Sequence, residues 1–485
     1  MTVKILVVLG YIGMIIWLGI AGMRKTKSFS DFFLGGRDVG PWFTAFTYGT
    51  AYFSAVIFIG FAGKIGWAFG LSGVWIALGN ALIGTFLVWV LLGNKVKEVT
   101  VKLNVHTMPE YLESRYNSPF FKTYAAIAIF VFLVPYTAAV FMGLSYLFEA
   151  TFGLPYWMML AFMGVFTGIY LVLGGYKSMT MVDFIFGIIM LFGVGALFSS
   201  TVTKGGGLSQ ILTTLSQIDP KLTQAVGPPG FWPLFSLVFL TSVAPLGMPQ
   251  LLQKFYAIRD RRSVRIGTFA STIFAILIAG VAYFTGALTR VFITPANSPE
   301  AFTASGAPNF DALMPALLTQ AIPESLTILI LLLMLSASMS TLAALVLISS
   351  STVTKDLYGG LVNKQASDKR LTTLMRIAST FFIILSVILA LLRPAVIVTI
   401  LSISWGAIAS VFLGPFLWGL FTKRFSKVGA IATSIIALTT TMFLFIGKFQ
   451  SAPSAGAIGM MVSLALPIFF LPFGKGEGEM VKAKA

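Results

Sequence analysis

The chain has 485 residues, of which 57% are hydrophobic and 10% are charged, a composition that excludes an ordinary soluble domain and is typical of a polytopic membrane protein. The absence of cysteine and the single histidine, His106, exclude disulfides, thiolate chemistry and a histidine metal cluster. The net charge of +17 is spread over several loops, so we expect a lipid bilayer and no nucleic acid as partner.

Apolar runs of about 20 residues, the length of a helix that crosses a bilayer, recur along the whole chain. They predict an all-α fold with about thirteen membrane-spanning helices, at residues 4–22, 43–70, 72–94, 120–148, 154–173, 178–201, 230–255, 266–289, 324–352, 372–392, 394–420, 428–447 and 455–473. Most Lys and Arg residues fall in connections that these helices place on one side, and the positive-inside rule makes that side cytoplasmic. We therefore expect a multi-pass protein of the cell (inner) membrane, with its N-terminus outside and its C-terminus inside.

The second and seventh predicted helices are interrupted in mid-span. The second carries Gly49, Thr50 and Ser54. The seventh carries Pro245 and Pro249, which remove backbone donors and clash with the preceding turn. Corresponding broken helices in two halves of a chain are typical of a secondary transporter with inverted repeats and a binding site at the breaks. The alternative is that both are merely kinked packing helices, because Gly and Pro are common in membrane spans.

The ninth predicted helix offers oxygen ligands on one face. Ala337, Ser340 and Thr341 stand at i, i+3 and i+4, so one carbonyl and two hydroxyls face the same way. Such uncharged oxygens suit a small desolvated cation such as sodium. The alternative is that these hydroxyls bond to their own helix or join neighbouring helices.

Six motifs, in order along the chain, resemble the sodium:solute symporter family, which includes sodium-coupled sugar, proline, pantothenate, sialic acid and monocarboxylate carriers. They are SDFFLGGRDVGPW (30–42), FIGFAGKIGWAFGLSGVW (58–75), TMPEYLESRYNS (107–118), GGYKSMTMVDFIFG (174–187), MPQLLQKFYAIRD (248–260) and MSTLAALVLISSSTVTKDLY (339–358). The last of these is the most specific.

The resemblance implies a leucine-transporter-like fold made of two inverted five-helix repeats. The corresponding division of the chain is a peripheral first helix and basic loop (1–27), a first repeat (28–201), a second repeat (202–425), and two peripheral helices with a tail (426–485). It also implies a secondary active transporter that imports a small organic solute with sodium by alternating access, without an organic cofactor and without enzymatic activity. The oligomeric state is not indicated.

The resemblance further implies where the ion and the solute bind. The implied sodium ligands are the carbonyls of Thr50, Phe53 and Ala337 and the hydroxyls of Ser340 and Thr341, and the implied solute-binding residues at the two breaks are Ser54, Ile57, Pro245 and Pro249. Asp183 matches an acidic residue near the inner sodium exit, and an acid inside a membrane is a functional candidate by default. Its structural alternative is an ion pair with Lys177.

The solute is less well indicated. This chain has APLGMPQ where proline carriers resemble GYFGQPH, and Val74 where sugar carriers have a glutamate, so both solutes are disfavoured. Residues 286–323 are more similar to the pantothenate and monocarboxylate branches, which favours a carboxylate-bearing solute. The alternatives are a proline or amino-acid symporter, a proton-coupled or sodium-independent carrier on the same fold and, more remotely, an ion channel.

Lys64 is the one charge in the apolar stretch 53–70, in the outer half of the second predicted helix. A lysine at this depth is costly and needs a reason. It could pair with a carboxylate at the outer end such as Glu149, gate the outer vestibule, or attract an anionic solute from the vestibule.

Overall fold

The computed structural model describes residues 2–23 and 29–473, and within these residues the chain is helical, with two isolated β-bridges and no named strand. The first half contains α1 (Thr2–Met23), α2 (Phe29–Leu34), η1 (Gly35–Arg37), α3 (Pro41–Tyr52), η2 (Ile57–Phe61), α4 (Ala62–Phe69), η3 (Gly70–Gly73), α5 (Val74–Ala81), η4 (Leu82–Leu87), α6 (Val88–Lys102), α7 (Met108–Tyr116), α8 (Pro119–Phe152), α9 (Tyr156–Lys204), α10 (Leu208–Ile218) and η5 (Pro220–Thr223). Here η2 and η4 are π-helical, and η1, η3 and η5 are 3₁₀ turns.

The second half contains two more breaks in regular helix, at η6 and η8. Its elements are α11 (Phe231–Val243), η6 (Ala244–Gly247), α12 (Pro249–Ala257), α13 (Arg261–Ala287), α14 (Thr289–Phe292), η7 (Pro299–Ala301), α15 (Phe310–Ala321), α16 (Glu324–Ser351), the π-helix η8 (Thr352–Val362), α17 (Asp368–Leu392), α18 (Ile397–Phe421), α19 (Lys427–Ile446), α20 (Ala452–Phe470) and η9 (Leu471–Phe473).

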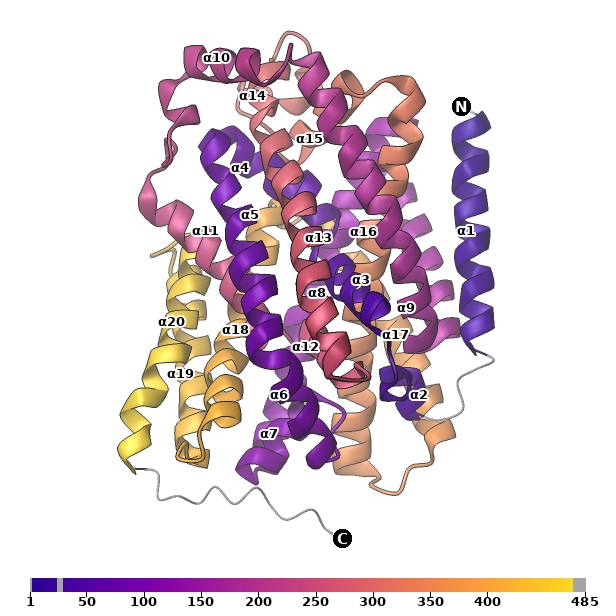
Figure 1. Ribbon diagram of the computed structural model, residues 1–485, viewed down its shortest axis with the longest axis vertical. Helices are drawn as coiled ribbons and strands as arrows, with labels where there is room; N and C mark the ends of the chain where they lie inside the picture. Colours follow the sequence, from indigo (N-terminus) through magenta and orange to yellow (C-terminus); the bar gives the residue numbers. More distant parts are fainter. Residues whose placement is uncertain (1, 24–28, 474–485) are drawn as a thin grey trace.

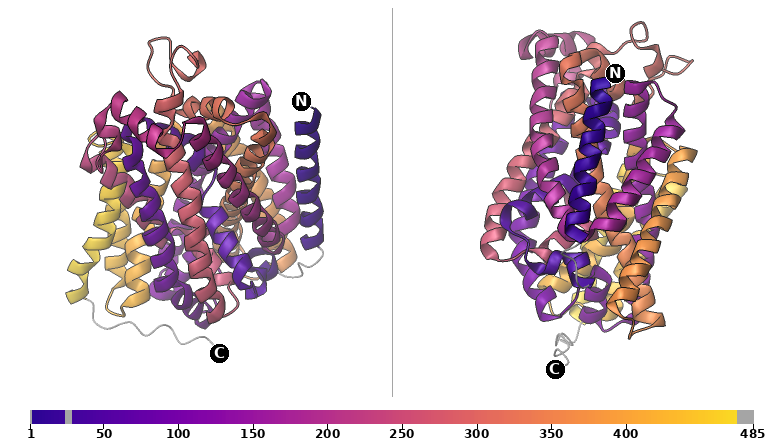
Figure 2. Two further views of the ribbon diagram at one scale, coloured as in Figure 1. Left: turned by 45° about the horizontal axis from the view of Figure 1, so that its top comes forward. Right: turned by 90° about the vertical axis from the view of Figure 1, so that its right-hand side faces the viewer.

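Figure 1 shows a bundle of roughly parallel and antiparallel helices. Helix α1 stands at one edge, against α9, and α19 and α20 stand at the opposite edge, against α18. Short helices α10, α14 and α15 lie at one end of the bundle, here called the upper end, and α2 and α7 lie at the other, the lower end. Figure 2 shows the connection between α14 and α15 standing above the upper end.

Burial separates central helices from peripheral ones. In the most apolar part of each span, 89% of residues are buried in Ile397–Phe421 and 83% in Glu324–Val362, but only 33% in Lys427–Ile446. Helices α18 and α16 therefore form the centre of the bundle, and the exposed apolar faces of helices such as α19 suit contact with lipid.

The thirteen predicted segments all coincide with helices of the structure. The segments 154–173 and 178–201 form one long helix, α9, which has a non-helical residue between them, Gly175 (φ 62°). Among the described residues, nine helices are long and apolar enough to cross a membrane by themselves, or ten if the bent pair α11–α12 counts as one span. The number of thirteen and the orientation in the membrane remain predictions.

Polar caps start several helices at the lower end. The Thr107 side chain accepts from the Glu110 amide (3.1 Å) at the start of α7, and Asp260 accepts from the Ser263 amide (2.7 Å) at the start of α13. Each cap satisfies a donor that the first turn of a helix leaves unpaired.

Candidate functional site

The predicted break of the second helix is present between α3 and η2. Phe53 and Ser54 are not helical, and Phe53 has extended backbone (φ −108°, ψ 105°). After the break the Ala55 amide donates to the Ser338 hydroxyl of α16 at 3.2 Å. Since that amide would otherwise serve the carbonyl of Ala51, the break leaves carbonyl groups available at the centre of the protein.

The predicted break of the seventh helix is also present. Helix α11 ends at Val243, the 3₁₀ turn η6 follows, and α12 starts at Pro249 after a bend of 41°. Met248 at the bend is extended, and Pro249 at the first position of α12 needs no donor of its own. The structure thus contains both of the broken helices that the sequence predicts.

The oxygen ligands predicted on α16 meet the first break. The Thr341 hydroxyl lies 3.3 Å from the carbonyl oxygens of both Thr50 and Ala51, and 3.1 Å from that of Ala337. The Ser340 hydroxyl lies 2.8 Å from that of Thr50. The structure therefore brings together four of the five predicted ligands. Ala51 is an additional oxygen donor that the sequence reasoning missed, because no side-chain pattern marks a carbonyl.

This cluster is chemically suited to a small hard cation. It consists of carbonyl and hydroxyl oxygens from an unwound segment and a facing helix, the donor set by which broken helices of transporters hold sodium. Thr341 also donates to the carbonyl of Ala337 in its own helix, as the alternative interpretation of these hydroxyl groups predicts. Phe53 lies at the break, and its ring lines the adjoining cavity.

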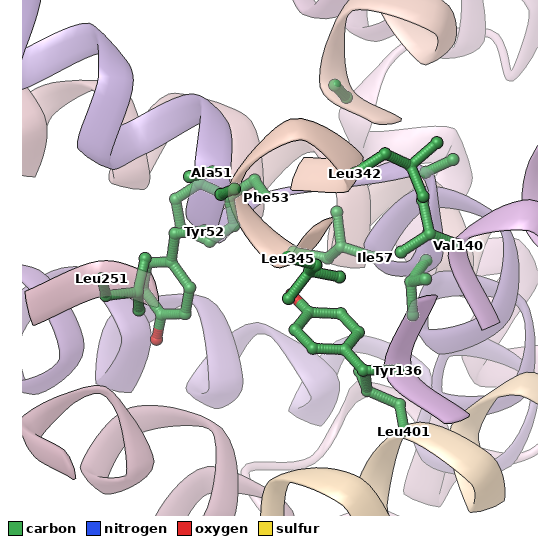
Figure 3. Packing of buried hydrophobic residues seen from close by; sticks show 14 of the residues in the cluster. Ala51, Tyr52, Phe53, Ile57, Tyr136, Val140, Leu251, Leu342, Leu345 and Leu401 are labelled. Carbon is green, nitrogen blue, oxygen red and sulfur yellow. The ribbon is translucent and has the colours of Figure 1, made fainter. Parts of the chain in front are cut away.

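A small cavity adjoins the break. Its lining residues come from both broken helices and from α5, α8, α13 and α18: Tyr52, Phe53, Ser54, Val56, Ile57, Phe61, Asn80, Tyr136, Thr241, Tyr283, Leu401 and Trp405. Figure 3 shows Tyr52, Phe53, Ile57, Tyr136 and Leu401 among the apolar side chains packed here. The cavity measures about 30 Å³, room for about one or two water molecules, and we call this conformation closed because the cavity is too small for an organic solute.

The cavity wall is rich in aromatic residues, and none of its described lining residues carries a charge. Tyr52 stacks on Phe53 (4.4 Å between ring centroids) and on Trp405 (6.0 Å), and Tyr136 meets Trp405 edge to face (5.8 Å). The indole nitrogen of Trp405 is buried without a hydrogen-bond partner among the described residues, and Asn80 accepts from Ser242 at 3.1 Å. Sequence reasoning predicted Ser54 and Ile57 in this wall but missed Tyr136, Tyr283 and Trp405, which come from helices outside the six motifs.

Residues 32–437 match the model of the sodium:solute symporter family. The chain belongs to this family. It is therefore a membrane transporter of the symporter class, as its six motifs predicted. The match covers both broken helices and α16, so the site described above lies within the shared region.

Characterised relatives match over nearly their full length. The chain is 27% identical to the osmoregulated proline transporter of Bacillus subtilis over 458 residues, covering 91% of this chain and 89% of the relative. It is 28% identical to the sodium/pantothenate symporter of Escherichia coli over 472 residues (93% of each), and 26% identical to the sodium/proline symporter of the same species over 470 residues (93% and 91%).

Solved structures identify the fold. A sodium-coupled sialic acid symporter in a substrate-bound outward-open state matches with a TM-score of 0.80 at 18% identity, covering 97% of each chain. A nucleobase–cation symporter in a closed conformation matches with a TM-score of 0.53 at 13% identity, covering 93% of this chain and 95% of that one. The symporter thus has the leucine-transporter-like fold.

The other predicted solute-binding residues lie outside the cavity wall. Pro245 is buried in η6 and Pro249 starts α12, so both shape the second break without lining the cavity in this conformation. Lys64 lies on α4, toward the upper end, and its ammonium group is 5.6 Å from the Phe310 ring centroid.

The ion-pair interpretation of Lys64 named Glu149 as one example of a carboxylate at the outer end. The acidic group with which Lys64 interacts electrostatically is Asp311 of α15, rather than Glu149. Helix α15 packs directly on α4, so closely that a Cβ at Gly63 would lie 2.7 Å from the Phe310 carbonyl oxygen. This packing joins residues nearly 250 positions apart, which no local pattern indicates.

Asp311 joins three elements at the upper end. It is 3% exposed, and its carboxylate accepts from the Ile397 amide in the first turn of α18 at 3.1 and 3.4 Å. Burial raises the pKa of Asp311 to about 6, although the bond to Ile397 and the charge of Lys64 both lower it. The desolvation cost therefore exceeds the stabilisation from these partners.

Lys177, the ion-pair partner expected for Asp183 in the structural alternative, was wrong. Lys177 lies 4.0 Å from Asp31, at the lower end. Asp183 is instead fully buried on α9, where it interacts electrostatically with Lys254 of α12. The hydroxyl groups of Ser340 and Thr47 are its polar neighbours. Asp183 therefore lies next to the candidate sodium site.

Proposed function

We propose that this symporter imports a small carboxylate-bearing solute together with sodium, by alternating access across the cell membrane. The convergence of Thr50, Ala51, Ala337, Ser340 and Thr341 carries the proposal, because their oxygen atoms suit a small cation and lie beside a cavity at the break. The carbonyl of Phe53 completes the proposed ligand set once the ion is present. The concentration of basic residues in the loops of the lower end supports a cytoplasmic location for that end.

The uncharged cavity wall supports a particular way of holding the solute. With no Lys or Arg among the lining residues, a carboxylate would be neutralised by sodium and by backbone dipoles at the breaks. A solute that carries no negative charge would gain nothing from this arrangement. Relatives that are named as pantothenate and proline transporters are consistent with such a carboxylate.

The aromatic wall favours a second candidate, a compact zwitterion such as proline. The faces of Tyr52, Tyr136 and Trp405 attract a cationic group by the cation–π interaction, which contributes about 0.5–2 kcal/mol. A monocarboxylate has no group for these faces except apolar carbon. The two candidates therefore differ in whether the solute carries an ammonium group.

Uptake into proteoliposomes tests the sodium coupling. A sodium gradient should drive accumulation, and Ser340→Ala with Thr341→Ala should raise the sodium concentration for half-maximal uptake about tenfold or more, because two oxygen ligands are lost. Ser350→Ala is the matched control, since Ser350 is also buried on α16 but bonds to its own helix through Val346 (2.6 Å). Equal uptake with a proton gradient alone, or without any ion gradient, would favour the proton-coupled or sodium-independent alternative.

Counterflow with matched solutes distinguishes the candidates. Proline and cyclopentanecarboxylate have similar ring sizes and differ in the ammonium group, and pantothenate and pyruvate complete the panel. Competition by proline alone would identify an amino-acid symporter, whereas competition by cyclopentanecarboxylate or pyruvate would identify a monocarboxylate carrier. No competition by any carboxylate would refute the proposal.

A further inference from the structure

A buried pair of opposite charges lies beside the candidate sodium site without closing into contact. Asp183 and Lys254 are both fully buried. The two carboxylate oxygens of Asp183 have no hydrogen-bond partner among the described residues, and the ammonium nitrogen of Lys254 has none either. The two groups interact electrostatically, and the ammonium group lies 5.1 Å from the centroid of the Tyr176 ring.

An ion pair that serves stability is built differently in this same protein. Lys122 and Glu113, at the lower end, meet at 2.8 Å. Burying a charge costs several kcal/mol unless contact and hydrogen bonds offset the cost, so an open pair with unsatisfied atoms is a poor structural device. The separation between Asp183 and Lys254 leaves the carboxylate able to interact with a second cation.

A sodium ion in the candidate site would be this second cation. Ser340 is a neighbour of Asp183 and also bonds to Thr50 at 2.8 Å within the site. A sodium ion held by Ser340 and Thr341 would therefore be attracted electrostatically by the Asp183 carboxylate. Lys254 is on α12, the lower half of the second broken helix. A change in the bend at η6 would therefore change the distance between Lys254 and Asp183.

We propose that Lys254 is a built-in cation that competes with sodium for the Asp183 carboxylate. When sodium occupies the site, two cations share one carboxylate, which weakens sodium binding enough for its release. When sodium leaves, Lys254 neutralises Asp183, so that no second sodium ion is needed at this acid. This inference rests on the sodium coupling proposed above and assigns a role to a residue outside the ligand set.

Sodium binding to the purified protein tests the competition without transport. Thermal unfolding is followed at increasing sodium chloride, with N-methylglucamine chloride holding the ionic strength constant and no solute present. Lys254→Gln should lower the half-saturating sodium concentration on the order of tenfold, because a like charge in a buried region is removed. Lys254→Arg, which keeps the charge, should stay within about threefold of wild type.

Asp183→Asn and the double variant test whether both charges influence sodium binding. Asp183→Asn should raise the half-saturating concentration on the order of tenfold, since only the repelling ammonium remains. Asp183→Asn with Lys254→Gln should return it to within about threefold of wild type. This neutral pair also covers the case in which Lys254→Gln alone does not fold, since removing Lys254 from the Asp183→Asn background must then tighten sodium binding. Lys122→Gln, which removes a buried lysine elsewhere, is the matched control and should leave sodium binding unchanged.

The outcomes separate this inference from the proposed function. Sodium-dependent stabilisation of the wild type with unchanged half-saturation in Lys254→Gln, or with no tightening in the Asp183→Asn background, would overturn the competition while sodium coupling stands. An absence of sodium dependence in the wild type would refute sodium coupling itself, and the role of Lys254 would fall with it.

Discussion

Asp311 can be used to shift the upper end of the symporter between closed and open conformations. In the closed conformation it accepts from the Ile397 amide at 3.1 Å and interacts with Lys64 of α4, so it holds α15, α18 and α4 together. A Cβ at Gly60 would lie 2.4 Å from Cγ2 of Ile397, so α18 also packs directly on η2. Opening the upper end requires these elements to separate.

Two substitutions at Asp311 should differ in their effect. Asp311→Asn removes the buried charge but keeps an oxygen acceptor for the Ile397 amide, so it should favour the closed conformation. Asp311→Ala also removes the charge but leaves the Ile397 amide unpaired, which costs about 1–3 kcal/mol. The open population should therefore be about fivefold to a hundredfold larger in Asp311→Ala than in Asp311→Asn.

The pKa of Asp311 gives the magnitude and the sign of the effect of removing the charge. Its rise from 3.8 to about 6 in the closed conformation corresponds to about 3 kcal/mol. If opening exposes the carboxylate and restores its ordinary pKa, the closed conformation binds the proton more tightly than the open one. Acidification from pH 7 toward pH 4 should then favour closure, and Asp311→Asn should remove this dependence on pH.

Cysteine labelling measures the effect directly, because the chain has no cysteine of its own. Leu401→Cys places one thiol in the cavity wall, and a membrane-impermeant maleimide added to intact cells reports access from outside. Each variant is compared with the parent at the same pH, which cancels the ionisation of the thiol itself. Glu300→Gln, an exposed acid at the same end, is the control. Labelling that is equal in Asp311→Ala and Asp311→Asn, or faster in Asp311→Asn, would refute the reasoning.

Four further outcomes are expected. Lys64→Met should lower the free energy of unfolding, measured by thermal unfolding, by at most about 1 kcal/mol more at pH 8 than at pH 5, because Asp311 is ionised and needs its partner only above about pH 6. A changed maximal rate at unchanged stability would indicate a gate, and a salt-dependent loss of affinity would indicate attraction of an anionic solute. Asp183→Asn should slow turnover at saturating sodium while equilibrium binding of solute is nearly unchanged, and wild-type turnover would contradict its placement near the inner exit. Trp405→Phe should weaken solute binding by about two- to tenfold if the solute accepts from the free indole nitrogen, and equal dissociation constants in a binding titration would exclude that contact. Gly66→Ala should abolish folded expression, because its Cβ would lie 1.9 Å from the backbone of Gly286, and a monodisperse gel-filtration peak of wild-type yield would disprove this packing.

The features predictable from sequence are those with local causes. Pro245 and Pro249 break a helix through their own rings, and Ser54 stands where helical residues stop, so both breaks were visible within a few residues. The i, i+3, i+4 spacing of the α16 ligands follows from the helical repeat, and the structure brings Ser340 and Thr341 to the break as expected.

The missed features all depend on packing between distant segments. Asp311 interacts with Lys64 only because the short helix α15 lies on α4, and Lys254 interacts with Asp183 only because the fold brings its ammonium group to α9, 5.1 Å from the Tyr176 ring centroid. Hydrophobic patterns show which face of a helix is buried but not which helix covers it. Lys177, the partner proposed for Asp183 from proximity in sequence, was therefore wrong, and the acid that interacts with Lys64 is Asp311 rather than the example Glu149. The repeat boundaries and the identity of the solute stay predictions.

A backbone contact at the lower end provides a native reporter of opening toward that side. Val39, which precedes α3, pairs with Ile258, which follows α12, in a short parallel bridge. The Val39 amide donates to the Ala257 carbonyl at 3.1 Å, and the Arg259 amide donates to the Val39 carbonyl at 3.0 Å. The segments leading to the two broken helices are thus joined by two bonds that depend on no side chain. When the lower end opens, the amide hydrogens of Val39 and Arg259 should exchange with deuterated solvent together, at a rate that rises and falls with the population of that conformation.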